Sequence, residues 1–357
     1  MPQTLPLDAF LDAPGAILDV RSPAEFEQGR IPGALNLPLF ENDERAQVGT
    51  CYKQRGREAA IELGLSLVGP KLVTMVQQAK AWAGDRHVRV HCWRGGMRSG
   101  SVAWLLETAG LKVTVLKGGY KTFRRWCLAR FEQPKPISIL GGMTGSGKTD
   151  ILHALAELGE PVLDLEGLAN HRGSSYGGLT QPPQPSTEQF ENEIAVRWER
   201  FSDRHPIWIE GESRRIGACR IPQALFDRMM RAPVVQVERP RAERVRYLVE
   251  IYGAAQRDEL IAATERIRKR LGGARAQEAV RAIQQGNLAR AADIVLDYYD
   301  KTYTYDLQQR PAPILTADVS GQTPTETARL LRDRAAQVFT DPPTRQAPTL
   351  AGVVPKP

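Results

Sequence analysis

A short glycine-rich run near the middle of the chain constrains the fold more than any other stretch. The run, Gly142-Met143-Thr144-Gly145-Ser146-Gly147-Lys148-Thr149, has the spacing G-x-x-x-x-G-K-[ST] that is typical of a P-loop. The apolar residues 137–140 precede it as a strand pattern, and apolar residues at helical spacing follow it from Ile151. A strand, a phosphate-binding loop and a helix in this order predict an α/β domain built on a parallel sheet.

The chemistry of this loop follows from its residue types. Glycines let backbone N–H groups wrap around phosphate oxygens, Lys148 adds a mobile cation, and Thr149 is a ligand for Mg²⁺ where a metal accompanies the phosphates. Binding of a diphosphate or triphosphate is therefore predicted, without hydrolysis being implied, for Gly142, Thr144, Gly145, Ser146, Gly147, Lys148 and Thr149.

Two carboxylates follow apolar runs in the same part of the chain. The strand pattern 206–213 contains Glu210 where a P-loop protein usually has an aspartate, and Asp164 follows Val162 and Leu163. Each carboxylate either supports Mg²⁺ or caps a turn, and the sequence leaves both interpretations open.

A second glycine-rich loop, His91-Cys92-Trp93-Arg94-Gly95-Gly96-Met97-Arg98-Ser99, lies between an apolar run at 88–90 and a helical pattern from Val102. A strand-to-helix turn of this kind aims backbone N–H groups and the positive end of the helix at one point. Together with the cations of Arg94 and Arg98, these groups favour the thiolate, which is the nucleophilic form of cysteine. We predict that Cys92 is a catalytic nucleophile assisted by both arginines; the simpler alternative is an inert core cysteine.

Length, charge and cysteine usage set limits on the rest. A chain of 357 residues is long for one domain and suggests two. Four widely spaced cysteines without a CxxC pair argue against a zinc site or a disulfide framework. The N-terminus lacks a signal-peptide pattern and the apolar runs are short, so we expect a cytoplasmic protein without a membrane segment. The net charge of +7 suggests an anionic partner.

Ser22 as N-cap, Pro23 as first helical residue and Glu25 at the capping-box position predict the start of a helix after the apolar run 16–20. The N-terminal stretch LDVRSPAEFEQGRIPGALNLP and the later HCWRGGMRS together resemble the rhodanese domain, over about residues 5–130. The resemblance implies that Asp19 and Arg21, at the end of a strand, lie near the cysteine loop, and that Cys92 carries sulfur or a heavier chalcogen. Five residues separate Cys92 from Arg98, whereas sulfur-carrying rhodaneses usually have four. The H-C-x5-R-S spacing is also that of cysteine-dependent phosphatases, so a phosphatase remains open on this loop alone.

Other residues are candidates with a plain structural alternative beside each. Cys51 is either a second thiol that resolves an adduct on Cys92 or a packed cysteine at a helix start. His171 and Arg172 lie in the long polar loop 170–178 and are binding candidates, unless the loop is an ordinary connector.

Basic and aromatic residues are dense in the last third of the chain. Arginines at 239–246 and 266–275 either contact RNA phosphates or form solvated helix faces. The four tyrosines between 298 and 305 either stack on unpaired bases or pack a helix end.

Taken together, HCWRGGMRSGS, GGMTGSGKT, the loop LEGLANHRGSSYGG and IEGESRRIG resemble the tRNA 2-selenouridine synthase family over about residues 5–335. The resemblance implies a rhodanese-like parallel-sheet domain at 1–133 and a P-loop NTPase-like α/β domain with a helical C-terminal part at 134–339. A proline-rich tail at 340–357 is expected to be disordered.

The same resemblance implies an activity. A tRNA wobble 2-thiouridine would become 2-selenouridine by S-geranylation from geranyl diphosphate and then selenation from selenophosphate, with Cys92 as selenium carrier. The alternative activity is a rhodanese-type sulfurtransferase or an HCx5R cysteine phosphatase regulated by a nucleotide-binding domain. A non-catalytic RNA-binding module and an ATP-dependent kinase are weaker possibilities, the kinase because the usual aspartate is absent after residue 209.

Overall fold

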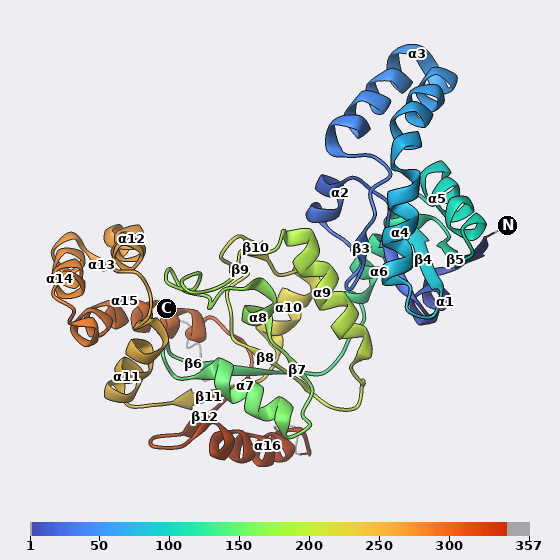
Figure 1. The fold of residues 1–357 in the computed structure, drawn as a ribbon. Coiled ribbons are helices and arrows are strands. Elements are labelled where there is room, and N and C mark those ends of the chain that lie inside the picture. The colour runs from blue at the N-terminus through green and yellow to red at the C-terminus, as the bar shows by residue number, and fades with distance from the viewer. Residues whose placement is uncertain (1, 341–357) are drawn as a thin grey trace, which may run out of the picture.

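The computed structural model describes residues 2–340, so the predicted proline-rich tail lies outside the described residues apart from its first position. Two parallel sheets, one in each half of the chain, organise the molecule (Figure 1). This confirms the α/β fold class predicted from the two loops. The boundaries at 133 and 339 stay predictions.

The N-terminal sheet has the strand order β1-β5-β4-β2-β3, and all of its pairs are parallel. Its strands are β1 (Gln3–Leu5), β2 (Ala16–Asp19), β3 (Leu35–Asn36), β4 (His87–His91) and β5 (Lys112–Leu116). Its helices are α1 (Leu7–Asp12), α2 (Pro23–Gln28), α3 (Asn42–Val68), α4 (Leu72–Trp82), α5 (Met97–Thr108) and α6 (Gly119–Arg130).

The start of α2 shows how local sequence brings the strand ends together. Ser22 and Glu25 form a capping box with Pro23 as the first helical residue, as the sequence predicts. The register pairs Asp19 of β2 with His91 of β4. The residues that follow the two strands, Arg21 and Cys92, therefore leave the sheet side by side at its carboxyl edge.

Helix α3 extends away from the sheet, whereas α4 runs back along it (Figure 1). By length and composition alone, the run Asn42–Trp82 is the one helical stretch among the described residues that is apolar enough to cross a membrane. The run is not one continuous helix, because a 3-10 turn at Gly69–Lys71 separates α3 from α4. Met75 and Ala79 of α4 are buried in the core of the N-terminal sheet, which accounts for part of its apolar character.

The second sheet has the order β12-β11-β6-β8-β7, again with parallel pairs throughout. Its strands are β6 (Ile137–Gly142), β7 (Val162–Leu163), β8 (Ile207–Glu210), β11 (Val234–Glu238) and β12 (Ile314–Asp318). Around it lie α7 (Lys148–Glu157), α8 (Leu165–Ala169), α9 (Thr187–Arg200), the hairpin β9 (Arg215–Ile216) and β10 (Cys219–Arg220), α10 (Gln223–Arg231) and α16 (Pro324–Thr340).

The helical part of the second domain is inserted between β11 and β12 (Figure 1). It consists of α11 (Arg241–Tyr252), α12 (Arg257–Arg266), α13 (Arg268–Leu271), α14 (Gly273–Gln284) and α15 (Leu288–Gln308). Its own small cores form where α12, α13 and α14 pack against α15 and Tyr176. The insertion stands at the carboxyl edge of the P-loop sheet, where ligands of open parallel sheets bind.

Helix α9 joins the two halves, and one hydrophobic core runs through both. Phe10 and Phe123 of the N-terminal half belong to the same buried cluster as Phe190 and Trp198 of α9 and Ile209 of β8. This shared apolar core fixes the N-terminal domain on the P-loop domain, so the two are not joined by a flexible linker alone.

Candidate functional site

The cysteine loop connects β4 to α5 and rests on the turn that connects β5 to α6. The carbonyl oxygens of Cys92 and Trp93 accept hydrogen bonds from the backbone N–H groups of Tyr120 and Lys121, at 2.9 and 3.0 Å. Gly119 has a φ of 62°, and a Cβ at this position would collide with the Cys92 carbonyl oxygen. Gly119, the first residue of α6, is therefore a requirement of the cysteine loop.

Cys92 itself is buried, and its sulfur lies 3.3 Å from the hydroxyl oxygen of Ser99. Burial alone raises the pKa of a thiol. Hydrogen bonds from the Ser99 hydroxyl and from the N–H groups of Ser99, Arg94 and Gly96 outweigh burial, so the pKa of Cys92 lies below its ordinary value. The loop thus favours the thiolate, in agreement with the predicted nucleophile.

The two arginines of the loop have different surroundings. Arg94 is exposed at the surface. Arg98 donates to Glu25 of α2, with Nη1 at 2.7 Å from a carboxylate oxygen. Burial raises the pKa of Glu25, but the hydrogen bond and charge of Arg98 outweigh it and lower that pKa. The Arg98 guanidinium is therefore held by an ion pair with α2, whereas Arg94 is open to solvent.

Asp19 and Arg21 lie beneath the cysteine loop, as the rhodanese resemblance implies. Both are fully buried and pair at 2.6 Å, and the Arg21 guanidinium also stacks over the Tyr120 ring at 3.8 Å. Asp19 lies 3.7 Å from His91. These residues are internal supports that fix the strand end and Tyr120, which in turn supports the loop backbone.

Cys51 lies on α3 and is buried. Within residues 2–340 neither a disulfide nor a hydrogen bond links it to Cys92. The resolving role of Cys51 stays a prediction, and the structure places this cysteine inside α3 rather than at a helix start.

The P-loop joins the end of β6 to the start of α7. Lys148 Nζ donates to the Gly142 carbonyl oxygen at 3.0 Å, and the Gly142 N–H donates to the Tyr303 hydroxyl at 2.7 Å. Tyr303 also bonds to Gln236 of β11. Gly145 and Gly147 have positive φ values of 82° and 79°, which only glycine adopts without strain. The loop therefore has the backbone that a phosphate cradle requires.

Carboxylates surround the start of α7. Thr149 donates to Glu166 at 2.9 Å, and Glu210 accepts from the Glu166 backbone N–H at 2.6 Å. Asp164 caps α8 by accepting from the Gly167 N–H at 2.7 Å. Glu210 and Asp164 thus both support the start of α8, which is the capping interpretation of these residues.

The same carboxylates repel one another electrostatically. Burial, then the charges of Asp164 and Glu166, raise the pKa of Glu210 well above its ordinary value. Burial and the charge of Glu166 raise the pKa of Glu212 to about 8. Burial likewise raises the pKa of Glu166, although Lys148 and Thr149 oppose the shift. The P-loop therefore lies beside more negative charge than Lys148 alone neutralises.

His171 and Arg172 line the cleft that opens over the P-loop, on the polar loop that follows α8. Burial and the nearby charge of Arg266 lower the pKa of His171, which keeps the imidazole neutral. The Arg172 guanidinium lies 5.9 Å from the Tyr252 ring centroid. The cleft has a volume of about 1020 Å³, and the P-loop residues from Gly142 to Thr149, apart from Met143, line it.

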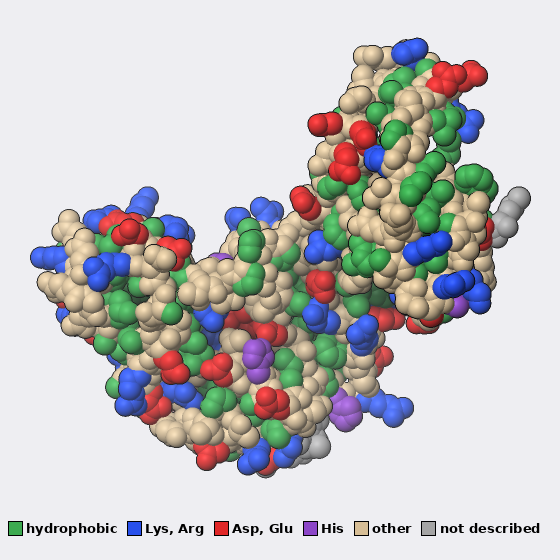
Figure 2. Space-filling model, in the orientation of Figure 1, with side chains coloured by type: hydrophobic (Ala, Val, Ile, Leu, Met, Phe, Trp, Pro, Cys, Tyr) green, Lys and Arg blue, Asp and Glu red, His purple; other side chains and the backbone are tan. Residues whose placement is uncertain are grey.

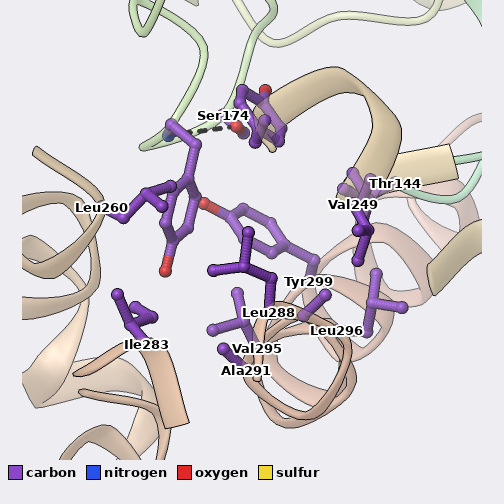
Figure 3. Close-up of a pocket in the computed structure, with 14 residues that line it drawn as sticks. Thr144, Ser174, Val249, Leu260, Ile283, Leu288, Ala291, Val295, Leu296 and Tyr299 are labelled. Carbon is purple, nitrogen blue, oxygen red and sulfur yellow. Dashed lines mark hydrogen bonds between the residues drawn. The ribbon is translucent and has the colours of Figure 1, made fainter. Parts of the chain in front are cut away.

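An apolar pocket with a cavity volume of about 60 Å³ adjoins this cleft (Figure 3). Leu248, Tyr252, Tyr299, Ser174 and the P-loop residue Thr144 line both spaces, so the pocket opens beside the phosphate cradle. Its inner wall comes from Leu260, Ile283, Leu288, Ala291, Val295 and Leu296, which Figure 3 shows pointing toward Tyr299.

Sequence reasoning did not single out Glu166, Glu212 or the aliphatic residues of this pocket. Glu166 and Glu212 occur in the stretches LEGLAN and IEGES, next to the two carboxylates that were weighed. In each stretch a glutamate follows closely after the carboxylate at the end of a strand, and this repetition was the signal that the sequence offered. The pocket residues gave none, because apolar residues at helical spacing look the same whether they line a pocket or fill a core.

Comparisons with known proteins agree on one family. A model described as the tRNA 2-selenouridine synthase AAA domain matches residues 135–329, and one described as a rhodanese-like domain matches residues 6–125. A protein of Marinobacter nauticus named tRNA 2-selenouridine synthase is 38% identical, covering 87% of this chain and 92% of its own. Proteins of the same name from Cronobacter sakazakii and Nitrosomonas europaea are 39% and 35% identical, covering 84% and 85% of this chain and 88% and 92% of their own.

The chain belongs to the tRNA 2-selenouridine synthase family. It is therefore an enzyme, and the resemblance deduced from its motifs is confirmed. As a member of this family the chain joins a rhodanese-like cysteine loop to a P-loop cleft, which favours a tRNA-modifying transferase over the phosphatase and the rhodanese-type sulfurtransferase.

Proposed function

We propose that the chain converts the wobble 2-thiouridine of a tRNA to 2-selenouridine in two steps, one in each domain. The P-loop domain transfers a geranyl group from geranyl diphosphate to the sulfur at C2. The rhodanese-like domain then replaces this sulfur by selenium from selenophosphate. The observation that carries the proposal is the apolar pocket that opens directly beside a phosphate cradle.

Geranyl diphosphate is a diphosphate joined to an apolar chain, and the cleft matches both halves. The P-loop amides and Lys148 suit the diphosphate, and the wall formed by α11, α12, α14 and α15 suits the hydrocarbon. In the first step the sulfur at C2 of the uridine attacks the allylic carbon of geranyl diphosphate. The bond between this carbon and the diphosphate oxygen breaks, and diphosphate leaves. Lys148 and the loop N–H groups stabilise the charge that develops on this leaving group.

Mg²⁺ suits the same place. Among residues 2–340 no three His, Cys, Asp or Glu side chains form a ready metal-ligand set. Mg²⁺ does not require one, since it keeps several waters and binds through one or two carboxylates and substrate phosphates. The raised pKa values of Glu166 and Glu210 fit a cation that neutralises them. Thr149 and Glu166 would hold Mg²⁺, which would add positive charge against the diphosphate.

In the second step selenium forms a bond to C2 and the geranylated sulfur leaves as geranylthiol. The Cys92 thiolate attacks the phosphorus of selenophosphate, the P–Se bond breaks, and the loop N–H groups carry the released selenide for its attack on C2. Water then cleaves the S–P bond and phosphate leaves, so selenium stays at the selenide level and no reductant is required. Exposed Arg94 attracts the anion.

The experiment separates the steps with an anticodon stem-loop RNA that contains 2-thiouridine, read by nucleoside mass spectrometry. We expect Cys92→Ser to accumulate S-geranyl-2-thiouridine and to form no 2-selenouridine. Lys148→Ala should form neither product, yet it should selenate RNA that is supplied already geranylated. Loss of geranylation in Cys92→Ser, with retention in Lys148→Ala, would overturn the assignment of steps to domains.

A further inference from the structure

Five of the ten arginines in the described helical part, residues 241–308, have acidic partners. Arg241 pairs with Asp293 and Asp297 at 2.6 Å, and Arg244 pairs with Asp300 at 2.8 Å. Further pairs join Arg268 to Glu265, Arg275 to Asp297 and Arg290 to Glu278. Part of the positive charge of the basic runs is therefore held in ion pairs within the helical part, and only the remaining cations are free for a ligand.

The cations at the mouth of the P-loop cleft differ from these arginines because they have no acidic partner among the described residues. Exposed Lys269 and Arg270 of α13 line the cleft, and neither has a carboxylate partner in the part of the chain that the structure describes. Arg270 donates only to the Tyr298 hydroxyl, at 3.2 Å. Arg268, the residue before them in the same short helix, is paired at 2.5 Å with Glu265.

The opposite rim of the cleft also carries exposed cations without acidic partners in the described part of the chain. Ser213 and Gly217 of the β9–β10 hairpin line the cleft, and Arg214, Arg215 and Arg220 of this hairpin are exposed. Within residues 2–340 no ion pair or side-chain hydrogen bond neutralises any of these three guanidinium groups. Lys and Arg side chains are visible on the helical part and over the hairpin in Figure 2, on either side of a hollowed surface.

We propose that these two rims, the α13 rim (Lys269, Arg270) and the hairpin rim (Arg214, Arg215, Arg220), bind the tRNA backbone on both sides of the cleft. Unpaired cations are what phosphate contacts require, because no protein carboxylate has to be displaced. A ribose-phosphate strand held at both rims places one unpaired base over the cleft, toward the P-loop. Tyr298, half-buried on the α13 rim, offers a ring against which such a base stacks.

This inference rests on the proposed function, since it takes the RNA to be the substrate of the P-loop cleft. The test measures binding of unmodified full-length tRNA to the whole protein at several salt concentrations. Lys269→Ala/Arg270→Ala and Arg214→Ala/Arg215→Ala should each weaken binding about tenfold and reduce the slope of log K against log salt by about 2, one unit per lost phosphate contact.

The control variant is Arg268→Ala/Arg290→Ala, which removes two exposed or half-buried cations that already have acidic partners. We expect it to bind tRNA within about twofold of the wild type. Equal weakening in the control, or wild-type affinity in both rim variants, would overturn the rims as the binding surface. The rise in melting temperature on adding inorganic pyrophosphate reports phosphate binding at the P-loop separately, and it should persist in every variant. If pyrophosphate does not stabilise the wild type, or if the wild type does not bind tRNA, the proposed function itself is contradicted.

Discussion

At the scale of single residues, Ser99 is the side chain on which the reactivity of Cys92 depends most directly. Its hydroxyl is the strongest of the hydrogen-bonding influences that lower the pKa of the thiol against the effect of burial. In Ser99→Ala the burial remains and this donor is lost, so the pKa rises. We expect the acid limb of Cys92 alkylation by iodoacetamide to move about one unit to higher pH, since one hydrogen bond to a charged group is worth roughly 1.5–3 kcal/mol.

The control for this change is Ser101→Ala, because Ser101 lies on the same helix and its hydroxyl bonds to the backbone oxygens of Met97 and Arg98. It should leave the alkylation profile unchanged. An unshifted profile in Ser99→Ala would mean that the backbone N–H groups alone hold the thiolate.

Glu212 gives a second prediction at this scale. Its pKa is raised to about 8 by burial and by Glu166. A carboxyl whose pKa is higher in the folded state stabilises the fold at low pH and loses this contribution as pH rises through 8. Glu212→Gln keeps a donor toward Glu166 and cannot ionise. We expect the variant to be more stable than the wild type at pH 9, by about 2 kcal/mol, and to match it at pH 5.

Thermal unfolding without added ligand or metal measures this difference. A gain that is the same at both pH values would show that Glu212 destabilises the fold by packing rather than by charge.

At the scale of elements, the sequence predicts best what neighbouring residues decide. The strand–loop–helix around Lys148 and the capping box of Ser22 and Glu25 occur where expected, because spacing along the chain determines both. The pairing of Arg98 with Glu25 joins residues 73 positions apart, so no local pattern contains it. The apolar pocket likewise cannot be predicted from local sequence, because it forms only when four helices pack together around Tyr299.

Helix α15 carries the prediction that tests this pocket. Ala292 lines it from a partly buried position. Ala292→Phe fills part of the space that we assign to the geranyl chain and leaves the P-loop unchanged. We expect kcat/KM for geranyl diphosphate to fall by about 10-fold or more, as hydrophobic pockets lose roughly 1–3 kcal/mol for small changes of shape.

Two further measurements make this result specific. Stabilisation by pyrophosphate should persist in Ala292→Phe, and dimethylallyl diphosphate, with its shorter chain, should lose less activity than geranyl diphosphate. Equal losses for both substrates would place the hydrocarbon elsewhere.

At the scale of the whole molecule, one interface holds the two domains and supports the cysteine loop. Asn192 of α9 donates to the Tyr120 hydroxyl at 2.8 Å and to the Arg30 carbonyl oxygen at 3.0 Å, and it accepts from Arg124 at 2.6 Å. Tyr120 also donates to Glu188 at 2.7 Å, and its backbone N–H supports the Cys92 carbonyl. Since a common apolar core surrounds this network, we expect the wild type to unfold in a single calorimetric transition.

Asn192→Ala removes three hydrogen bonds and leaves the Arg30 carbonyl oxygen without this donor. Tyr120 keeps its bond to Glu188, and Arg124 keeps its bond to Glu191. We expect the change to cost about 1–3 kcal/mol. Because the loss falls on the contact between the domains, the single transition should separate into two, and alkylation of Cys92 should change as Tyr120 loses one of its two side-chain anchors.

The matched control is Glu199→Ala, which removes an exposed ion pair with Arg130 at 3.2 Å across the same two helices, worth about 0–1 kcal/mol. The contrary result is a single transition in Asn192→Ala whose melting temperature falls no more than that of Glu199→Ala. That result would mean that the apolar core alone couples the domains and that the polar network adds no coupling.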